Sequence, residues 1–203
     1  VQMNRRSAQE TRAMINDAAL RVFSRSGYDG ASMRMIASEA GISVGALYLH
    51  YRSKEELCST VFRGLFEEFR NAIAERTRGI SDPAEQIRSY IRAYMEMARV
   101  HREFIYTFNK DKGFTFGVEW KQRFFVELRG FMNGIIRRGI EEGTFADIEE
   151  SEATKIVLSV LRGYVVSIVI DPENLFTADA CTDILLNGLV KRRDPEKGAG
   201  LSR

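Results

Sequence analysis

Residues 41–57, with the sequence GISVGALYLHYRSKEEL, hold the side chains of this chain that are best suited to binding another molecule. Ser43, Gly45 and Ala46 are small and fall on the first turn of a predicted short helix, so another surface can approach the backbone closely. Tyr48 and the basic residues that follow it can donate hydrogen bonds to an anion. The pattern therefore predicts a negatively charged partner at the start of this helix.

Two short helices are predicted on either side of Gly41, at residues 32–40 and 43–49. Ser32 and Ser43 each fit the N-cap of one helix, where a side-chain oxygen accepts a hydrogen bond from a backbone N–H group. Gly41 allows the positive φ angle that a tight turn between two helices needs. This spacing predicts a helix-turn-helix, whose second helix enters the major groove of DNA.

Residues 11–57 resemble the DNA-binding domain of the tetracycline-repressor (TetR) family. The chain matches the family pattern at Gly27-Tyr28, Ser32, Gly41-Ile42-Ser43, Gly45, Leu47-Tyr48, His50-Tyr51 and Ser53-Lys54-Glu55. The resemblance implies an all-α protein that regulates transcription, usually as a repressor, and that is not an enzyme. It also implies a homodimer, a double-stranded DNA operator of near-palindromic sequence, and a small effector bound by the helical C-terminal domain.

The contacts with DNA are implied by matching each position to the family pattern. Arg34 is expected to be the main polar contact to the bases, because residues 43–49 include no Arg, Asn or Gln for paired hydrogen bonds to a base edge. Tyr51 is expected to pack against the first helix, and His50 taken alone would more often cap a helix end. The residues expected to face DNA are Ser32, Arg34, Ser43, Val44, Gly45, Ala46, Tyr48, His50 and Lys54.

Positive charge is concentrated in the first quarter of the chain. Residues 1–54 hold eight Arg or Lys and four Asp or Glu, which gives a net charge of +4. Residues 55–203 hold the other 22 basic and 24 acidic residues, which gives a net charge of −2. Such a patch attracts polyanions, nucleic acid or an anionic membrane surface, so charge alone leaves these alternatives open.

The composition is typical of a soluble globular protein built from helices. Of the 203 residues, 44% are hydrophobic and 29% are charged, and only three are proline, which favours long helices. The two cysteines lie far apart in the sequence, which indicates reduced thiols rather than a disulfide. The apolar run at 156–170 is interrupted and short for a membrane span, and no secretory signal is evident. We therefore expect a cytoplasmic protein with no membrane partner.

Further helices are expected along the rest of the chain. The first helix covers residues 8–26 and ends at Gly27. Ser53 and Glu56 fit a capping box at the start of the fourth helix, and Asp82-Pro83 starts the next one. Later helices are predicted near residues 101–108 and at 118–142, 151–170 and 177–191. The expected domains are a helix-turn-helix DNA-binding domain at 8–54, an effector-binding and dimerisation domain at 55–192, and a flexible tail at 193–203.

Large aromatic residues are concentrated at residues 104–131, after a predicted helix that carries two tyrosines on one face. Such a set either fills a core or lines an apolar ligand pocket. Arg88, Arg92 and Arg99 border the tyrosine face, and fit either a solvated surface or a site for the acidic group of an effector. The residues expected to line the effector pocket are Tyr90, Tyr94, Phe104, Phe108, Phe116, Trp120 and Phe124.

The last two long helices are more apolar than solvated helices need to be. This indicates a two-fold interface in which two helices from each subunit form a four-helix bundle. The same side chains also fit packing within a single subunit. The residues expected at the dimer interface are Val157, Leu161, Val165, Ile168, Ile184 and Leu185.

Two other functions stay open at this stage. One is an enzyme of the helical C-terminal domain, although the sequence has no recognisable pairing of a nucleophile with a base. The other is an architectural DNA-binding protein without an effector, which would lack an internal cavity. No cofactor is expected, and no Cys/His/Asp cluster has the spacing of a metal site. His101 is expected at the surface and Cys58 as a packed thiol.

Overall fold

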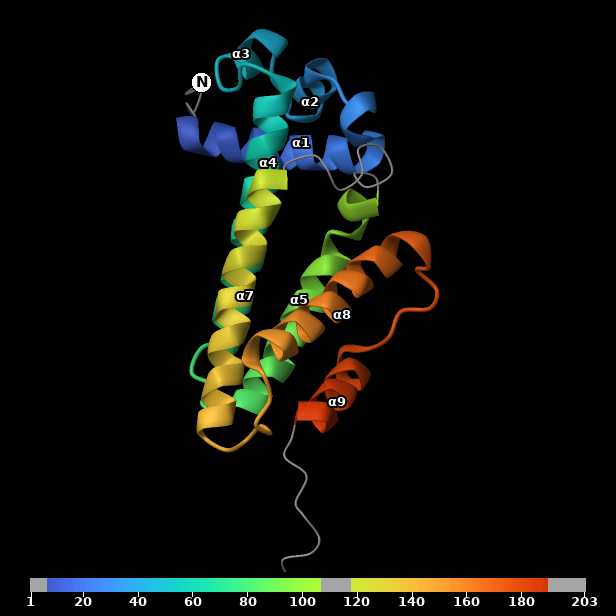
Figure 1. The fold of residues 1–203 in the computed structure, drawn as a ribbon. Coiled ribbons are helices and arrows are strands. Elements are labelled where there is room, and N and C mark those ends of the chain that lie inside the picture. Colours follow the sequence, from blue (N-terminus) through green and yellow to red (C-terminus); the bar gives the residue numbers. More distant parts are fainter. Residues whose placement is uncertain (1–6, 107–117, 190–203) are drawn as a thin grey trace, which may run out of the picture.

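The computed structural model describes residues 7–106 and 118–189, and the regular elements within these ranges are all helices (Figure 1). The all-α fold class expected from the sequence is confirmed. A short helical segment at residues 102–106 follows α5. The longer elements are α1 (Ala8–Gly30), α2 (Met33–Glu39), α3 (Val44–Tyr48), α4 (Lys54–Thr77), α5 (Pro83–Val100), α7 (Val118–Glu141), α8 (Glu150–Ile170) and α9 (Ala178–Leu189).

Helices α1, α2 and α3 form a small unit at one end of the molecule (Figure 1). Gly27 interrupts α1 with a φ angle of 67°, so the expected helix end is confirmed and residues 28–30 add only a turn. The side chain of Ser32 accepts a hydrogen bond from the N–H of Met35, and Gly41 has a φ angle of 67°. Ser43 accepts from the N–H of Ala46. The predicted helix-turn-helix is confirmed down to its caps.

Buried side chains in this unit fix the angle between its helices. Ile15, Ile36 and Leu47, one from each of the three helices, are fully buried and belong to one apolar cluster. Tyr51 is also buried, and its hydroxyl donates to Oδ1 of Asn16 at 2.6 Å. Tyr51 therefore packs on α1, as the sequence predicted.

Helix α4 connects the helix-turn-helix unit to the rest of the protein. It is 24 residues long, with Leu57 in the first apolar cluster and Ile73 in the second. The predicted capping box at its start is only half formed. Ser53 accepts from the N–H of Glu56, but the Glu56 carboxylate accepts from Arg52 at 2.8 Å instead of from Ser53.

The second apolar cluster lies among α5, α7, α8 and α9. Helix α5 begins at Pro83 with Asp82 as its cap, as predicted, and its predicted apolar face is buried. Helix α7 packs on α5 and α8, and α9 packs on α5. The cap of α9 is Thr177, whose hydroxyl accepts from the N–H of Ala180. Residues 190–203, which include the expected tail, lie outside the described residues.

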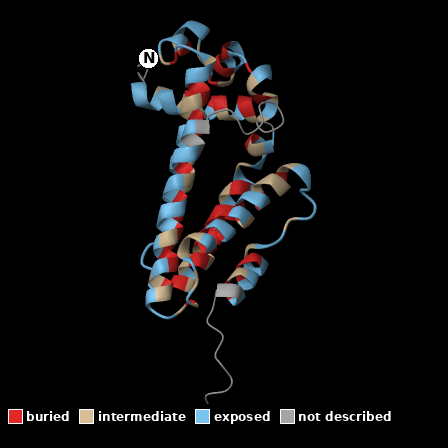
Figure 2. Ribbon diagram, in the orientation of Figure 1, coloured by how far each residue is buried: buried red, intermediate tan, exposed pale blue. Residues whose placement is uncertain are grey.

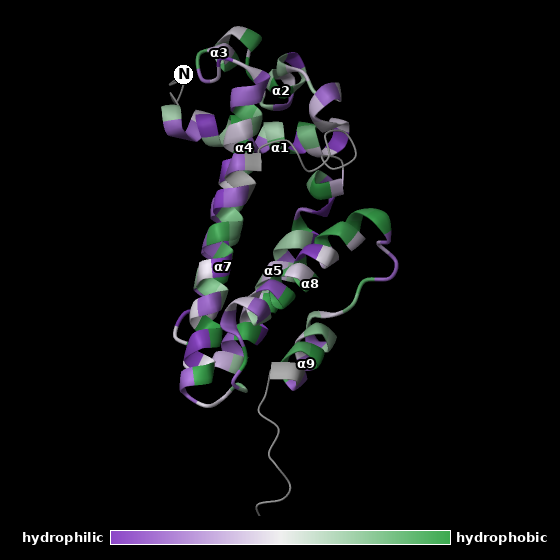
Figure 3. Cartoon of the chain, in the orientation of Figure 1, coloured by the Kyte–Doolittle hydropathy of each residue, from purple (hydrophilic) through white to green (hydrophobic). Residues whose placement is uncertain are grey.

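Helix α8 differs from its sequence-based description. By length and composition alone this 21-residue helix could cross a membrane, because it is longer than the interrupted apolar run at 156–170. In this protein it packs against α5 and α7 instead. Only 39% of the apolar 18-residue stretch within this helix is buried, however. Figures 2 and 3 show stretches of α8 and α9 that are both hydrophobic and exposed. The exposed large hydrophobic residues include Ile156 and Ile170 of α8 and Ile184 of α9.

Candidate DNA-binding surface and effector cavity

The start of α3 presents small and apolar groups to solvent. Val44 is 38% exposed and Tyr48 is 51% exposed. A Cβ atom added to Gly45 would meet nothing closer than the Ser43 Oγ at 4.0 Å. The glycine is therefore not required by packing inside the protein. A partner that approaches the backbone of α3 from outside gives a physical reason for its small size.

Helix α2 is held on α1 by a carboxylate between two arginines. Glu39 accepts from Arg21 at 2.8 Å and from Arg25 at 2.5 Å. These two hydrogen bonds, first that of Arg21, hold the pKa of the Glu39 carboxyl below its usual value. Arg34, on the exposed side of α2, makes no ion pair within the described part of the chain. Its guanidinium is therefore available to an outside partner.

Lys54 does not stand free at the start of α4. Its ammonium donates to the carbonyl of Tyr28 at 2.6 Å and to the carbonyl of Ala31 at 2.9 Å. The same nitrogen lies 4.3 Å from the centre of the Tyr28 ring. The ammonium thus has three contacts within the protein, while the residue stays partly exposed. His50 is half-buried, and its carbonyl accepts from Arg12 at 3.2 Å.

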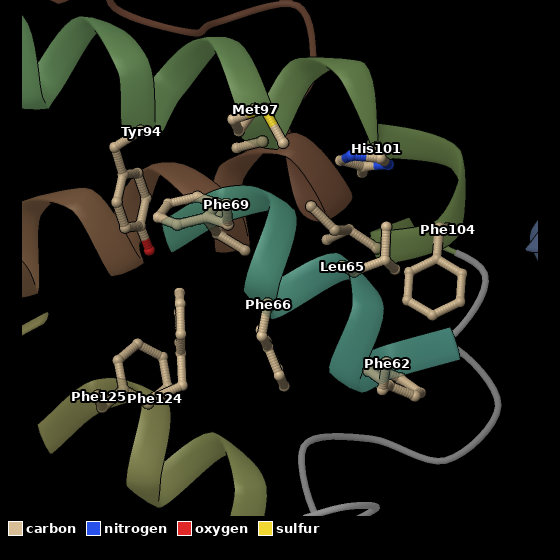
Figure 4. A pocket seen from close by; sticks show the side chains of 13 residues that line it. Phe62, Leu65, Phe66, Phe69, Tyr94, Met97, His101, Phe104, Phe124 and Phe125 are labelled. Carbon is tan, nitrogen blue, oxygen red and sulfur yellow. The ribbon is translucent and has the colours of Figure 1, made fainter. Parts of the chain in front are cut away.

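An apolar cavity of about 180 Å³ lies between α4, α5, α7 and α8. Figure 4 shows aromatic side chains from α4 and α7 converging on it, with Tyr94 in the second half of α5 and His101 at its C-terminal end. The lining residues are Phe62, Leu65, Phe66, Phe69, Tyr94, Met97, Ala98, His101, Phe104, Ile105, Phe124, Phe125 and Val165.

The sequence identified only part of this lining. Tyr94, Phe104 and Phe124 lie in the cavity wall as expected. Tyr90 does not line it; its ring is fully buried and stacks on Phe131 at 5.9 Å. Phe108 and Phe116 lie outside the described residues, and so does the side chain of Trp120.

The whole contribution of α4 was missed. Phe62, Phe66 and Phe69 fall on the apolar face of that helix, and the sequence pattern alone assigns such a face to a core. Phe66 stacks on Phe124 at 4.6 Å, and Phe69 meets the same ring edge-on at 5.2 Å. The available signal was an excess of phenylalanine over leucine along the face of α4.

The arginines expected to bind an acidic group have other partners. Arg88 donates to Asp183 at 2.8 Å and Arg92 donates to Asp179 at 2.9 Å, so both tie α5 to α9. Arg99 is exposed and does not line the cavity. Of the two alternatives left open by the sequence, these contacts favour a surface role for the arginines of α5. Arg162 of α8 is the cation beside the wall, with its guanidinium carbon 5.6 Å from the centre of the Phe125 ring.

His101 is not the surface residue that the sequence predicted. Its side chain is only 17% exposed and lines the cavity. Its Nε2 atom is buried without a hydrogen bond, and lies 3.6 Å from an Oε1 atom of Glu68. Burial raises the pKa of the other polar group in the wall, the Tyr94 hydroxyl, so that group stays protonated. The cavity thus joins an apolar body to a few hydrogen-bonding groups.

Most residues expected at a dimer interface point into their own subunit. Val157, Leu161 and Ile168 are buried in the second apolar cluster, so they are not free to contact a partner. Val165 lines the cavity, and Leu185 is half-buried. Of the six, Ile184 is the one with a largely exposed side chain, at 75%. Ile156 and Ile170, at 57% and 73%, were missed.

One continuous helix, α4, joins an exposed helix-turn-helix to an apolar cavity, and this architecture is typical of helix-turn-helix regulators. The model of the bacterial regulatory proteins of the tetR family matches residues 15–61. The HTH-type transcriptional regulator YerO of Bacillus subtilis is 34% identical over 99 residues, which is 47% of this chain and 34% of YerO. This match therefore spans about a third of that relative's length.

Longer similarities cover both parts of the chain. The fatty acid metabolism regulator protein of Bacillus subtilis is 25% identical over 153 residues, 73% of this chain and 76% of that protein. The crystal structure of a TetR transcription regulator from Haloarcula marismortui superposes with a TM-score of 0.79 at 20% identity, over 90% of this chain and 100% of that one. Residues 15–61 thus match the DNA-binding domain of the tetR family, and over most of its length the chain is similar to transcriptional regulators.

Proposed function

We propose that the protein is a homodimeric transcriptional repressor that leaves its operator when a small, largely apolar effector fills the cavity. The observation that carries this proposal is the course of α4. Leu57 and Val61 of α4 lie in the core of the helix-turn-helix unit, and Phe66 and Phe69 of the same helix line the cavity. A change at the cavity wall therefore has a direct structural route to the DNA-binding unit.

Binding to DNA is supported by the shape and charge of the helix-turn-helix unit. The exposed start of α3 fits a major groove, and Arg34 of α2 lies free to reach base edges or phosphates. The net charge of +4 on residues 1–54 adds the non-specific attraction on which such proteins depend. The proposed DNA-facing set is that expected from the sequence, Lys54 included.

A homodimer is supported by the apolar surface that one subunit leaves uncovered. Ile156 and Ile170 on α8 and Ile184 on α9 are all more than half exposed. Two such helices from each subunit form a four-helix bundle when they meet across a two-fold axis. The two recognition helices then face successive turns of a near-palindromic site, about 34–36 Å apart.

The chemistry of the cavity indicates the effector class. Its wall is made of aromatic and aliphatic side chains, with His101 and Tyr94 as its polar groups. A ligand with an apolar body and one hydrogen-bonding group satisfies both features. The similarity to a fatty acid metabolism regulator agrees with an apolar ligand. The effector acts by favouring one conformation of the dimer over another, and must prefer it by several kcal/mol to empty the operator.

Operator binding is tested by selecting duplexes from a random-sequence library with the wild-type protein and measuring their affinity by band shift. A selected near-palindrome, bound by one dimer with strong salt dependence, is the expected result. Failure to enrich any duplex, or a monomer in sedimentation at micromolar concentration, contradicts the proposal. Ile184→Asp combined with Ile156→Asp is expected to give the monomer.

Effector binding is tested by a thermal-shift screen of apolar compounds with and without a hydrogen-bonding group, followed by release of the selected duplex. His101→Phe keeps an aromatic ring and removes the ring nitrogens. It is expected to weaken binding of the hydrogen-bonding compounds roughly tenfold, as for one lost hydrogen bond, and to spare wholly apolar ones. Met97→Leu, in the same wall, is the matched control. If no compound both binds and releases the duplex, the protein is a DNA-binding protein without an effector.

A further inference from the structure

Two places in the cavity wall combine a polar side chain with a nearby charge, and the two charges differ in sign. At the first, the Tyr94 ring points from α5 toward Phe124 and Phe125 of α7, as Figure 4 shows. The second is at His101, seven residues later, at the C-cap of α5. Seven residues of an α-helix rise about 10 Å along its axis. One elongated ligand can therefore contact both places.

The Tyr94 side of the cavity, formed by Tyr94 and Arg162, carries a positive charge. The guanidinium carbon of Arg162 lies 5.6 Å from the centre of the Phe125 ring, which is part of the wall. Val165, which lines the cavity, follows Arg162 by three residues, so both lie on one face of α8. Arg162 donates to Ser159 at 3.1 Å, but makes no ion pair within the described part of the chain. The guanidinium, which has five N–H donors, can therefore bind the acidic group of a ligand.

The Tyr94 hydroxyl supplies a second donor on the same side. Burial raises the pKa of this hydroxyl, whereas the positive charge of Arg162, the smaller effect, lowers it. The hydroxyl therefore stays protonated at neutral pH and can donate. A carboxylate that accepts from both the Tyr94 hydroxyl and the Arg162 guanidinium makes two hydrogen bonds, one of them between oppositely charged groups.

The His101 side of the cavity, formed by His101 and Glu68, carries a negative charge instead. The Nε2 atom of His101 is buried without a hydrogen-bond partner among the described residues, and lies 3.6 Å from an Oε1 atom of Glu68. This distance is too long for a hydrogen bond. A hydroxyl group both donates and accepts, so a ligand hydroxyl at this side can bond to the ring and to the carboxylate. A second ligand carboxylate is disfavoured here, because Glu68 repels it.

We propose that the effector is an ω-hydroxy carboxylic acid, whose acidic group and hydroxyl group are separated by an apolar chain about 10 Å long. Its carboxylate binds at the Tyr94 side and its hydroxyl at the His101 side. Between the two sides the wall along α5 is formed by Met97 and Ala98, which suit an apolar chain. The inference rests on the proposed function, because it names the chemical class of the effector for the same cavity.

Calorimetric titration of the full chain without DNA tests the acidic group. Decanoic acid and decanamide have the same apolar chain, and only the acid is charged. We expect the acid to bind the wild type roughly tenfold more tightly, the low end for a hydrogen bond to a charged group, because Arg162 is exposed. Arg162→Gln is expected to abolish this preference. Arg99→Gln removes the same charge from an exposed position outside the cavity wall, and should leave the preference unchanged.

Equal binding of the acid and the amide by the wild type overturns the proposal, and so does a preference that survives in Arg162→Gln. Absence of binding by either compound also overturns it. Both arginines are exposed, so their replacement is not expected to unfold the protein. Thermal melting of each variant checks this, and Tyr94→Phe, which removes only the hydroxyl, provides a second test of the same side.

The hydroxyl end is tested with ω-hydroxydecanoic acid at about pH 8, where histidine in peptides is neutral. We expect it to bind the wild type roughly tenfold more tightly than decanoic acid, as for one further hydrogen bond. His101→Phe should remove this gain and keep the preference for acid over amide. The shorter ω-hydroxyhexanoic acid, which cannot reach both sides, should gain nothing over hexanoic acid. A gain that persists in His101→Phe, or tighter binding of decanedioic acid than of the hydroxy acid, contradicts the proposal.

Release of the selected duplex separates this inference from the proposed function. If ω-hydroxydecanoic acid binds as expected but releases no duplex, the proposed function fails, and the assignment of the two sides of the cavity stands. If other apolar compounds release the duplex while the acids show no preference over the amides, the inference fails, and the proposed function stands.

Discussion

The caps and turns of the helix-turn-helix unit are formed by residues that are close together in the sequence, whereas the cavity wall is formed by residues that are far apart in it. In the helix-turn-helix, each cap and turn is formed by residues within five positions of each other, as with Ser43 and the N–H of Ala46. The cavity wall combines residues from Phe62 to Val165. Local chemistry specifies the first region, whereas the second depends on how four helices happen to meet.

This difference predicts where single substitutions act most strongly. In the helix-turn-helix a few buried anchors hold very short helices, so each anchor carries a large share of the stability. In the C-terminal helices the apolar contacts are spread over many residues, and the strongest effects are expected where a side chain packs directly on a helix backbone. The predictions below test this contrast, in order of decreasing effect.

The largest effect is expected from Leu47→Ala. Leu47 is fully buried and fixes the five-residue helix α3 on the core. Removing a buried leucine side chain costs about 2–5 kcal/mol. Leu49, two residues later, is 86% exposed, so Leu49→Ala is the control and should change stability by less than about 0.5 kcal/mol. Denaturant unfolding measures both, and equal effects would show that α3 is not anchored in this way.

A similar pair of positions tests the C-terminal helices. A methyl group on Gly139 of α7 would overlap the ring of Phe145, which is buried. Gly139→Ala is therefore expected to destabilise the protein by about 1–3 kcal/mol. Gly134, on the same helix, has open space around it, so Gly134→Ala should stabilise by about 0.5–1 kcal/mol. Denaturant unfolding is again the measurement, and a stabilising Gly139→Ala would contradict the packing of Phe145.

The contrast also explains what the sequence could predict. Helix ends at Ser32, Gly41 and Ser43 were predicted correctly, because each follows from one residue type acting on its immediate neighbours. Tyr90 was assigned to the cavity and His101 to the surface, and both assignments were wrong. The helix that carries both residues and its apolar face were predicted correctly. Which neighbouring side chain covers each residue, however, depends on α4, α7 and α8. No pattern within α5 contains that information.

The same limit applies to charged residues. Arg88 and Arg92 lie at the border of an apolar face, where the sequence fits a solvent-exposed site or a ligand site equally well. Their true partners, Asp183 and Asp179, are about ninety residues away in α9. Lys54 is the parallel case within the helix-turn-helix unit. Its position within the motif was predicted correctly, but not its contacts with carbonyls more than twenty residues earlier in the chain.

Arg34→Ala tests the DNA-facing side of the helix-turn-helix. If Arg34 contacts a base edge, its loss lowers discrimination between the selected duplex and a variant at that base pair by about 1–3 kcal/mol. The folding stability should not change, because the side chain is exposed. Competition band shifts with single base-pair variants measure the discrimination. An equal loss of affinity for all duplexes would identify Arg34 as a phosphate contact instead.

The smallest effect is expected from Glu39→Gln, which tests the ion pairs between α1 and α2. The pKa of Glu39 is lowered by Arg21 and Arg25, so its contribution to stability is present above the pKa of the unfolded chain and is lost as the pH falls through the lowered folded value. Because these groups are exposed to solvent, salt screens the contribution. The variant should therefore melt slightly below the wild type at neutral pH and low salt, and the gap should close in acid or in high salt. A gap that persists in strong acid would mean that Glu39 acts through packing rather than through charge.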